Sequence, residues 1–430
     1  MSLSQAVSSF RQKKLAPFHM PGHKGRPPYE TADFFSCDIT EVAGADSLYQ
    51  ADGAIARLEQ EYARLYGAAA SLLSAGGSTL CIQTMLALVL REGDRLILSR
   101  TVHRAAVAAM GLLGVEPVWV WPVPPAQIEQ ALKENPAAAA VFVTSPDYSG
   151  QLCDLAAIGG ICRRWGKPLL VDNAHGAHLA FLPQSLHPMQ LGADLCCDSL
   201  HKTLPVLTGG AMLHIKNPAL APVAKQVMAL FGSTSPSYPV MLSADRALPY
   251  LKGAFKEELA ALCRQLERLR RAAVRRGFTL PALPADPMRI TLGYRGMGYS
   301  DAAFGHAVRA YGIEPEYNAG GVCVLMASPQ NTGEDLARLS ELITALPPLD
   351  PLAYAPPLPG PLAVAMGLRQ AMLAPRAALP NTPALAGRGA AAPLSVCPPG
   401  IPLAVPGEIL TAAALDALKI SGAQTLCVVE

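Results

Sequence analysis

The sequence predicts an α/β protein whose mostly parallel sheet is covered by helices on both faces. Short apolar runs bounded by polar residues or glycine recur between about residues 70 and 215, and helical patterns separate several of them. Strands that alternate with helices along a chain are typical of parallel sheets. In such sheets, ligands bind at the carboxyl ends of the strands.

Composition narrows the class of protein. The chain has 430 residues, of which 51% are hydrophobic and 16% charged, so we expect a large interior and two or three domains. A net charge of +2 gives no reason to expect nucleic acid or a membrane surface as a partner. The ten cysteines include no CxxC pair, and neither a secretory leader nor a membrane span is recognisable. These features favour a cytoplasmic protein with free thiols.

Residues 1–50 show little periodicity, and we expect an N-terminal arm with an active-site loop rather than a domain. Their PFHMPGHKGRPP string places proline and glycine where a helix would break. His19 and His23 could supply half of a metal site. Because nothing supplies the remaining ligands, we expect no metal.

Residues 51–240 are expected to form the large, cofactor-binding domain. An amphipathic helix over 54–67 ends at Gly67. Further helices are expected over 81–90, 103–113 and 155–166. Seven strand-like runs are expected, at residues 71–77, 95–100, 116–122, 139–146, 168–175, 194–200 and 210–215.

The pattern changes after about residue 240. A long helix with a basic outer face is expected over 257–277, and strands and a closing helix complete a small α+β domain over 241–347. The proline-dense segment 347–361 reads as a linker. It opens a last module over 348–430, which contains a helix at 409–422.

Two motifs in the predicted sheet carry the chemistry of a pyridoxal phosphate enzyme. Asp172 and Lys202 each follow an apolar run, so neighbouring strands would bring them to one pocket. A lysine amine can form a Schiff base with the cofactor aldehyde. A buried carboxylate can keep the pyridine nitrogen protonated, so that the ring accepts electrons. The alternatives are a surface lysine and an aspartate that caps a helix.

Other polar residues fall at the same sheet edge. His103 could stack on the cofactor ring, although a histidine near a helix start is also common. His175 and His201 could bond cofactor oxygens or shuttle a proton, whereas a structural role is expected for His178. Hydroxyls and N–H groups at a helix start form a phosphate cradle, here in the turn Gly76, Gly77, Ser78 and Thr79.

The motifs, taken in order, resemble the Orn/Lys/Arg decarboxylases in their short bacterial form. The strings are HMPGHKG, DITEVAGADSLYQADGAI, the Gly-Ser-Thr turn, DNAHGAH, DSLHKTLP, FGSTSPSY and CPPGIPLAVPGE. The resemblance covers about residues 17–415. It implies the aspartate aminotransferase-like fold (fold type I), a seven-stranded sheet and pyridoxal 5′-phosphate as cofactor.

The resemblance also assigns roles. Lys202 would hold the cofactor, Asp172 would pair with the pyridine nitrogen, and His103 would stack on the ring. His175 would lie near the phenolic oxygen. The phosphate would be bound by Gly77, Ser78, Thr79, Ser199 and His201. The segment 231–238, with Ser235, would reach into the neighbouring subunit, which implies a homodimer or a higher assembly with shared sites.

The chain departs from the family pattern at three residues. Leu80 and Cys81 stand where the family commonly has a Gly/Asn-type pair, which puts the geometry of the phosphate loop in doubt. Asn173 replaces the usual acid of the DEAHG string and could change substrate orientation. None of the three is a core cofactor residue.

The implied reaction is α-decarboxylation of arginine, lysine or ornithine, as in polyamine biosynthesis, and the sequence does not choose among the three. The cationic tail of the substrate needs a carboxylate. Glu41, Asp46 and Glu408 are candidates, and each is equally well explained as a cap or a surface charge.

Two rival functions remain open. An aminotransferase or aldolase would hold the substrate carboxylate with a late arginine, for which Arg369 or Arg376 could be proposed. A catalytically inactive, cofactor-binding paralogue is suggested by Cys81 and Asn173.

Overall fold

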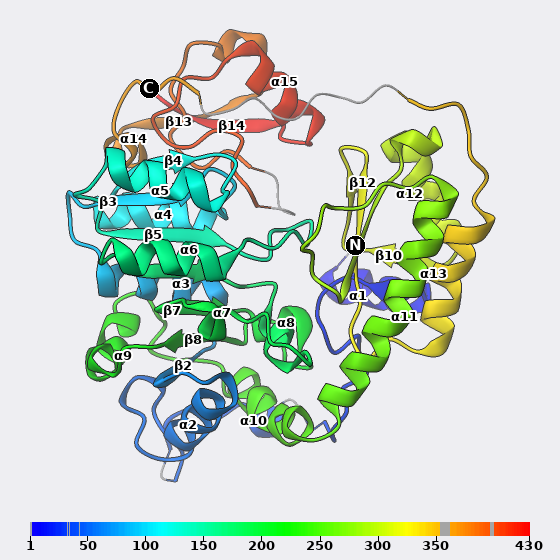
Figure 1. The fold of residues 1–430 in the computed structure, drawn as a ribbon, viewed down its shortest axis with the longest axis horizontal. Helices are drawn as coiled ribbons and strands as arrows, with labels where there is room; N and C mark the ends of the chain where they lie inside the picture. The colour runs from blue at the N-terminus through cyan, green and yellow to red at the C-terminus, as the bar shows by residue number, and fades with distance from the viewer. Residues whose placement is uncertain (1, 32, 34, 43, 353–361, 396–399) are drawn as a thin grey trace.

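A computed structural model describes residues 2–31, 33, 35–42, 44–352, 362–395 and 400–430 of the chain. Figure 1 shows a large sheet flanked by helices, a smaller domain beside it, and a C-terminal module that packs against the β4 end of the sheet. Within the described residues, no helix combines the length and the apolar character that a membrane span requires.

The seven strands of the large sheet lie in the order β2-β8-β7-β6-β5-β3-β4. Only β8 runs antiparallel to its neighbours, and the predicted mostly parallel, seven-stranded sheet is confirmed. Each strand falls within or next to a run that the sequence singled out. The bounds are β2 (Ala70–Ser74), β3 (Arg95–Ser99), β4 (Glu116–Val120), β5 (Ala140–Thr144), β6 (Leu169–Asp172), β7 (Leu195–Asp198) and β8 (Ala211–Ile215).

Helices cover both faces of this sheet because alternate residues of each strand point to opposite sides. Leu96 and Leu98 belong to the apolar cluster on one face, and Ile97 belongs to the cluster on the other. The first face is covered by α3 (Gly77–Val89), α4 (Arg104–Leu113) and α9 (Ala221–Ala229). The second is covered by α5 (Pro125–Glu134), α6 (Leu155–Arg164) and α7 (Pro188–Leu191).

The N-terminal segment contains a helix that the sequence analysis missed. Helix α1 (Leu3–Gln12) starts at a capping box formed by Ser2 and Gln5. Its apolar residues Leu3, Val7 and Phe10 have helical spacing but remain exposed, so they form no core pattern. The chain then forms β1 (Ala16–Phe18), which pairs with a strand of the small domain.

The small domain is built on an antiparallel sheet and a long helix. Strand β12 (Val322–Met326) lies between β11 (Tyr317–Ala319) and β9 (Arg289–Gly293), and β10 (Ile313–Pro315) is the partner of β1. Helix α11 ends at Gly277, whose φ of 99° permits a left-handed cap. The helices are α10 (Tyr238–Lys252), α11 (Phe255–Arg276), α12 (Asp301–Ala310) and α13 (Gly333–Ala345).

The C-terminal module joins the large domain through a buried ion pair between Arg100 and Glu408 at 2.9 Å. The predicted linker over 347–361 lies largely outside the described residues. Elements of the module are α14 (Leu368–Leu373), β13 (Arg376–Pro380), α15 (Ala412–Ile420) and β14 (Thr425–Val429). Two further helices of the large domain are α2 (Ala54–Tyr66) and α8 (Leu200–Thr203).

Candidate active site

Asp172 and Lys202 come together at the carboxyl ends of two adjacent strands. Asp172 is the last residue of β6 and is 2% exposed. Lys202 lies in the short helix α8 that directly follows β7, the neighbour of β6. Burial lowers the pKa of Lys202, and the nearby Asp172 opposes that shift. This is a desolvated amine close to a buried carboxylate, as the sequence analysis expected.

His175 connects Lys202 to an arginine of the small domain. Its Nε2 lies 3.0 Å from Lys202 Nζ, and its Nδ1 lies 3.0 Å from Nη2 of Arg289. Burial and the neighbouring cations hold the pKa of His175 well below its usual value, so the ring is neutral. Sequence reasoning missed Arg289; the only available signal was a charged residue at the start of a buried strand.

His103 fits both readings that the sequence left open. It is the N-cap of α4, where its Nδ1 accepts a hydrogen bond from the N–H of Ala105 at 3.2 Å. It also lies close enough to Asp172 and Lys202 for both to shift its pKa, which burial lowers. A helix-capping imidazole near Asp172 and Lys202 is therefore compatible with contact to a cofactor ring.

The Gly-rich turn forms the first turn of α3, which begins at Gly77 rather than at the expected Cys81. No side chain caps this helix start, and its first turn holds no acidic residue. The φ of 69° at Gly77 is a conformation that glycine adopts without strain. Its uncapped N–H groups, with Ser78 and Thr79, can bind a phosphate.

Leu80 and Cys81, the first two departures from the family pattern, point into the protein interior. Both belong to the apolar cluster beneath the sheet face that α3 covers. Burial raises the pKa of the Cys81 thiol to about 12. These side chains pack α3 against the sheet and leave the first helical turn to the backbone and the hydroxyl residues.

Hydroxyl groups beside Lys202 provide a test of whether the site suits pyridoxal phosphate. The Ser199 and Thr203 hydroxyls are buried without a hydrogen-bond partner in the described part of the chain. Buried polar groups are normally satisfied, so a ligand bound at Lys202 would supply the partner that these two hydroxyls lack. His201 lies between them, and its Nδ1 donates to the Gly210 carbonyl at 3.1 Å. Burial lowers the pKa of His201 to about 4. The residues fit an anionic, aldehyde-bearing cofactor.

Asn173, the third departure, belongs to a separate buried group that we call the Asp198 cluster: Asp198, Asn173, His187 and His214. The Asp198 carboxylate accepts hydrogen bonds from Asn173 Nδ2 at 2.6 Å, His187 Nε2 at 3.0 Å and His214 Nε2 at 3.2 Å. These bonds hold the pKa of Asp198 well below its usual range, despite burial. The cluster lies beneath the ends of β6 and β7.

Lys24, from the PGHKG string, has a different environment from Lys202. Its ammonium donates to the carbonyls of His19 and Met326. Burial lowers the pKa of Lys24 to about 7.

Gly22, from the same string, lies against the Lys202 turn: its N–H donates to the His201 carbonyl at 2.8 Å. A Cβ at Gly22 would lie 2.6 Å from the Leu204 carbonyl oxygen. The string therefore fixes the turn that carries Lys202.

The three carboxylates considered for the substrate tail lie in different surroundings. Asp46 accepts backbone N–H groups at the start of α2, including those of Gly53 and Ile55. Glu408 is fully buried, and its carboxylate bonds Arg100 and the N–H of Val405. Asp46 therefore acts as a cap and Glu408 as an interdomain contact, whereas Glu41 is exposed near Tyr238.

A carboxylate that sequence reasoning missed lies nearer to Lys202. Glu316 lies between β10 and β11 and is close enough to raise the pKa of Lys202. Its Oε1 accepts from the Tyr148 hydroxyl at 3.0 Å, and its Oε2 accepts from the N–H of Met20 at 2.9 Å. The Tyr148 ring meets the ring of His175 edge-on, with 5.5 Å between centroids. No local pattern marked either residue.

The remaining candidates lie apart from this group. Arg369 bonds the Leu112 carbonyl at the end of α4, and Arg376 bonds the Met372 carbonyl. Ser235 is exposed just before α10. The assignment of Ser235 to a neighbouring subunit stays a prediction.

Comparison with known proteins gives a consistent result. A family described as "Orn/Lys/Arg decarboxylase, major domain" matches residues 2–283. An uncharacterized Bacillus subtilis protein, YaaO, is 32% identical over 311 residues, which cover 67% of this chain and 65% of that protein. An arginine decarboxylase of Halalkalibacterium halodurans is 28% identical over 455 residues, covering 95% and 91% of the two chains.

Solved structures share the fold. The lysine decarboxylase LdcF of Francisella novicida has a TM-score of 0.73 at 15% identity, over 100% of this chain and 84% of that one. The constitutive lysine decarboxylase of Escherichia coli has a TM-score of 0.69 at 18% identity, over 88% and 74%. A Sphingomonas wittichii serine palmitoyltransferase has a TM-score of 0.57 at 17% identity, over 67% and 74%. At these identities the likeness concerns the fold.

Proposed function

Because the chain belongs to the Orn/Lys/Arg decarboxylase family, whose enzymes depend on pyridoxal phosphate, we propose that it decarboxylates a basic amino acid. The substrate would be arginine, lysine or ornithine, and the product agmatine or a diamine. The observation that carries the proposal is the desolvated amine of Lys202 beside buried Asp172, at the carboxyl edge of the sheet.

The cofactor would be held by the residues that fit it. Lys202 would bind it covalently and Asp172 would face its pyridine nitrogen. His103 would lie on the ring, and the first turn of α3 would take the phosphate with Ser199. When bound, pyridoxal phosphate accepts the electrons that the breaking bond to the carboxylate leaves behind.

The protein's own residues would orient the substrate and move protons. Lys202 and His175, 3.0 Å apart, are placed to return a proton to the substrate α-carbon after carbon dioxide leaves. Arg289 holds His175 from the small domain. Gly22 of the PGHKG string supports the turn that carries Lys202, because its N–H donates to the His201 carbonyl at 2.8 Å.

We place the cationic tail of the substrate at Glu316. Its carboxylate lies near Lys202, and Tyr148 and Tyr317 meet edge-on beside it with ring centroids 5.7 Å apart. Carboxylates and aromatic faces both attract organic cations. Glu316→Gln is expected to raise KM for the basic amino acid about tenfold or more, about 1.4 kcal/mol or more, with a smaller change in kcat.

Glu314→Gln is the matched control for Glu316→Gln. Glu314 lies two residues away on β10 and pairs instead with Arg309 at 2.7 Å. KM should stay near the value of the unmodified protein. An equal rise in KM for both variants would contradict the role of Glu316.

The reaction is tested by product identification. The purified protein with cofactor is incubated with arginine, lysine and ornithine in turn, while carbon dioxide is measured and the amine identified by mass spectrometry. Carbon dioxide and the matching amine support the proposal. Keto acid without carbon dioxide would establish an aminotransferase. A shift of the cofactor absorbance without product would establish an inactive binding protein.

We also propose that the protein is a homodimer located in the cytoplasm. We expect a homodimer in which the 231–238 segment closes the partner's site, and sedimentation of the purified protein would detect it. This segment packs beside the Glu41 and Asp46 region, since the Tyr238 hydroxyl donates to the Asp46 carbonyl. The free thiols of the described cysteines agree with a reducing cytoplasm.

A further inference from the structure

Three side chains, Arg289, His175 and Lys202, form a chain of hydrogen bonds whose direction is fixed at one end. An arginine guanidinium carries five N–H donors and no acceptor. The bond between Arg289 Nη2 and His175 Nδ1, at 3.0 Å, therefore requires Nδ1 to be the acceptor. A neutral imidazole has a single proton, which must then lie on Nε2.

The position of the proton on His175 also determines the role of the Lys202 amine in their hydrogen bond. With a proton on Nε2, His175 is the donor in its 3.0 Å contact with Lys202 Nζ, so Nζ must accept. Only an unprotonated amine has a lone pair that can accept. We propose that Arg289 is a positioning residue that fixes the tautomer of His175 and thereby holds the Lys202 amine in its neutral, nucleophilic form.

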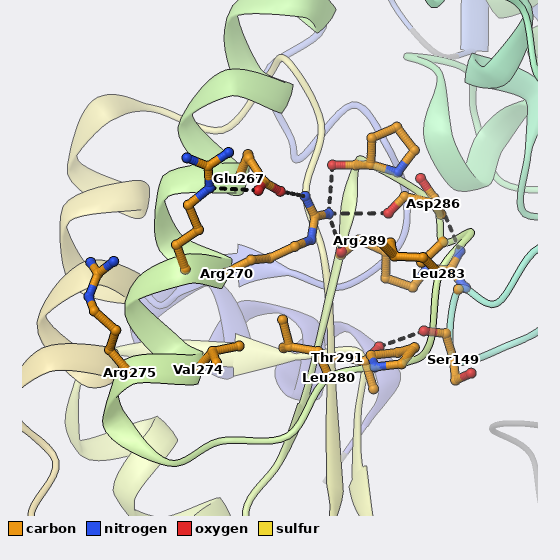
Figure 2. Close-up of a pocket in the computed structure, with 15 residues that line it drawn as sticks. Ser149, Glu267, Arg270, Val274, Arg275, Leu280, Leu283, Asp286, Arg289 and Thr291 are labelled. Carbon is orange, nitrogen blue, oxygen red and sulfur yellow. Dashed lines mark hydrogen bonds and ion pairs between the residues drawn. The ribbon is translucent and has the colours of Figure 1, made fainter.

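Arg289 cannot easily turn away from this position. It is 4% exposed, and its Nη1 donates to the carbonyls of Asp147 and Tyr148 at 2.9 and 2.8 Å. Figure 2 shows its strand anchored from α11, where Arg270 reaches across to the segment that starts at Asp286. Thr291 adds a bond to the Ser149 carbonyl at 2.7 Å. The donor that faces His175 is thus held from both domains.

The surroundings of Lys202 also lower its pKa on balance, which favours the neutral amine. Burial lowers its pKa most, and Arg289 adds to the lowering, while Asp172, Glu316 and Cys197 oppose it. Among the facing histidines, burial lowers the pKa of His103, His175 and His201. All three are neutral near pH 7 and add no charge beside the amine, whereas Arg289 is a cation that lowers its pKa.

As a consequence, the cofactor-free protein already holds Lys202 in the form that reacts with an aldehyde. An amine that is neutral at pH 7 attacks an aldehyde directly, whereas an ammonium must first lose a proton. The inference concerns the protein without cofactor and holds whichever amino acid is the substrate.

The tautomer can be measured directly in the cofactor-free protein. Selective ¹⁵N labelling of histidine gives separate nitrogen shifts for the two neutral tautomers, and the His175 signal is assigned by its loss in His175→Gln. We expect the Nε2-protonated form in the unmodified chain. A predominantly Nδ1-protonated ring would overturn the proposal, and this result needs no variant of Arg289.

A second measurement tests the effect on the amine. The pH dependence of Lys202 labelling by an acylating reagent is followed by mass spectrometry in cofactor-free protein. Arg289→Met should raise the apparent pKa of Lys202 by about one unit, so that the whole labelling profile shifts by about one unit toward higher pH. Arg270→Met is the structural control, because Arg270 supports the same segment without touching His175. An unchanged Lys202 profile in folded Arg289→Met, or an equal change in Arg270→Met, would refute the role.

Discussion

Two buried groups of carboxylate and histidine lie at the ends of adjacent strands, and they differ in how completely their polar atoms are paired. In the Asp198 cluster, three side chains donate to one carboxylate. Its two imidazoles also use their second nitrogens, His187 with the N–H of Met189 and His214 with Ser71. Around Lys202, the hydroxyls of Ser199 and Thr203 are buried and unpaired, and in the Asp198 cluster Asn173 Oδ1 is the one buried atom without a partner in the described part of the chain.

This difference in hydrogen bonding distinguishes a structural role for the Asp198 cluster from a functional role for the surroundings of Lys202. A hydrogen-bond network whose members satisfy one another stabilises the fold and fixes local geometry. Unpaired buried groups cost stability and persist where a ligand completes them. Although both groups contain similar residue types, the carboxylate and both imidazoles of the first are fully paired, so we assign the first as the platform and the second as the site.

The largest effect should follow removal of the reactive amine. Lys202→Ala is expected to abolish both covalent cofactor binding, read from the visible absorbance band, and decarboxylation. Lys24→Met, at the other buried lysine, should keep the band because Lys24 bonds backbone carbonyls rather than groups of the site. Loss of the band in Lys24→Met with retention in Lys202→Ala would reverse the assignment.

Asp172→Asn should leave the protein folded but lower its kcat. The change keeps the shape of the side chain and its acceptor for the Ala174 N–H, and removes only the charge. We expect kcat to fall about 100-fold or more, because electrostatic stabilisation at a buried site is a large part of catalysis. The thermal midpoint of the cofactor-free protein is measured alongside. A lower thermal midpoint with unchanged kcat would show that Asp172 has a structural role, like the Asp198 cluster, and no catalytic one.

Asp198→Asn should show the opposite pattern. The isosteric amide cannot accept from all three donors, and the free energy of unfolding should fall by about 2 to 4 kcal/mol. Because no member of the cluster is proposed to touch substrate, activity of the protein that remains folded should change less than in Asp172→Asn. Urea unfolding and initial rates at low temperature, measured together, decide between the two outcomes.

Acidification should weaken the protein through the buried neutral histidines of both groups. The folded pKa values of His175, His201 and His214 lie below the unfolded value near 6.5. Their contribution is complete above that value and is lost as the pH falls, since the unfolded chain then binds more protons. Between pH 7 and 5 we expect a loss of about 1 to 3 kcal/mol. Urea unfolding across this range should show a positive slope, reduced in His201→Gln; a flat profile would contradict the assignment.

Below about pH 4 the carboxylates should add a second loss. The folded pKa of Asp198 lies well below its usual range, and that of Asp286, which pairs with His178, is about 2. Stability from such groups is present above the unfolded value near 3.9 and disappears as the pH falls toward the folded value.

The sequence predicted the parts of the site that lie on one stretch of sheet. Apolar runs located all seven strands, and the order of two polar motifs after them placed Asp172 and Lys202 together. Arg289 and Glu316 could not be found this way. Each belongs to the small domain, and the bond from Arg289 to His175 joins residues 114 positions apart. A single charged residue in a strand has no periodicity that would reveal its partner.

Local patterns also left boundaries and roles open. The glycines before Cys81 read as a turn, which predicts a helix start at Cys81, yet α3 begins at Gly77. Asp46 could be read as a substrate ligand or a cap, and only its backbone donors distinguish the two.

The seating of the PGHKG string has a consequence for biosynthesis. The Gly22 carbonyl accepts from the Ser328 hydroxyl, 306 positions later, and the Lys24 ammonium needs the Met326 carbonyl, 302 positions later. These residues leave the ribosome early, but their partners are translated only when three quarters of the polypeptide exists. The nascent chain must therefore carry this stretch incompletely docked until the small domain is made, and the pocket is completed late.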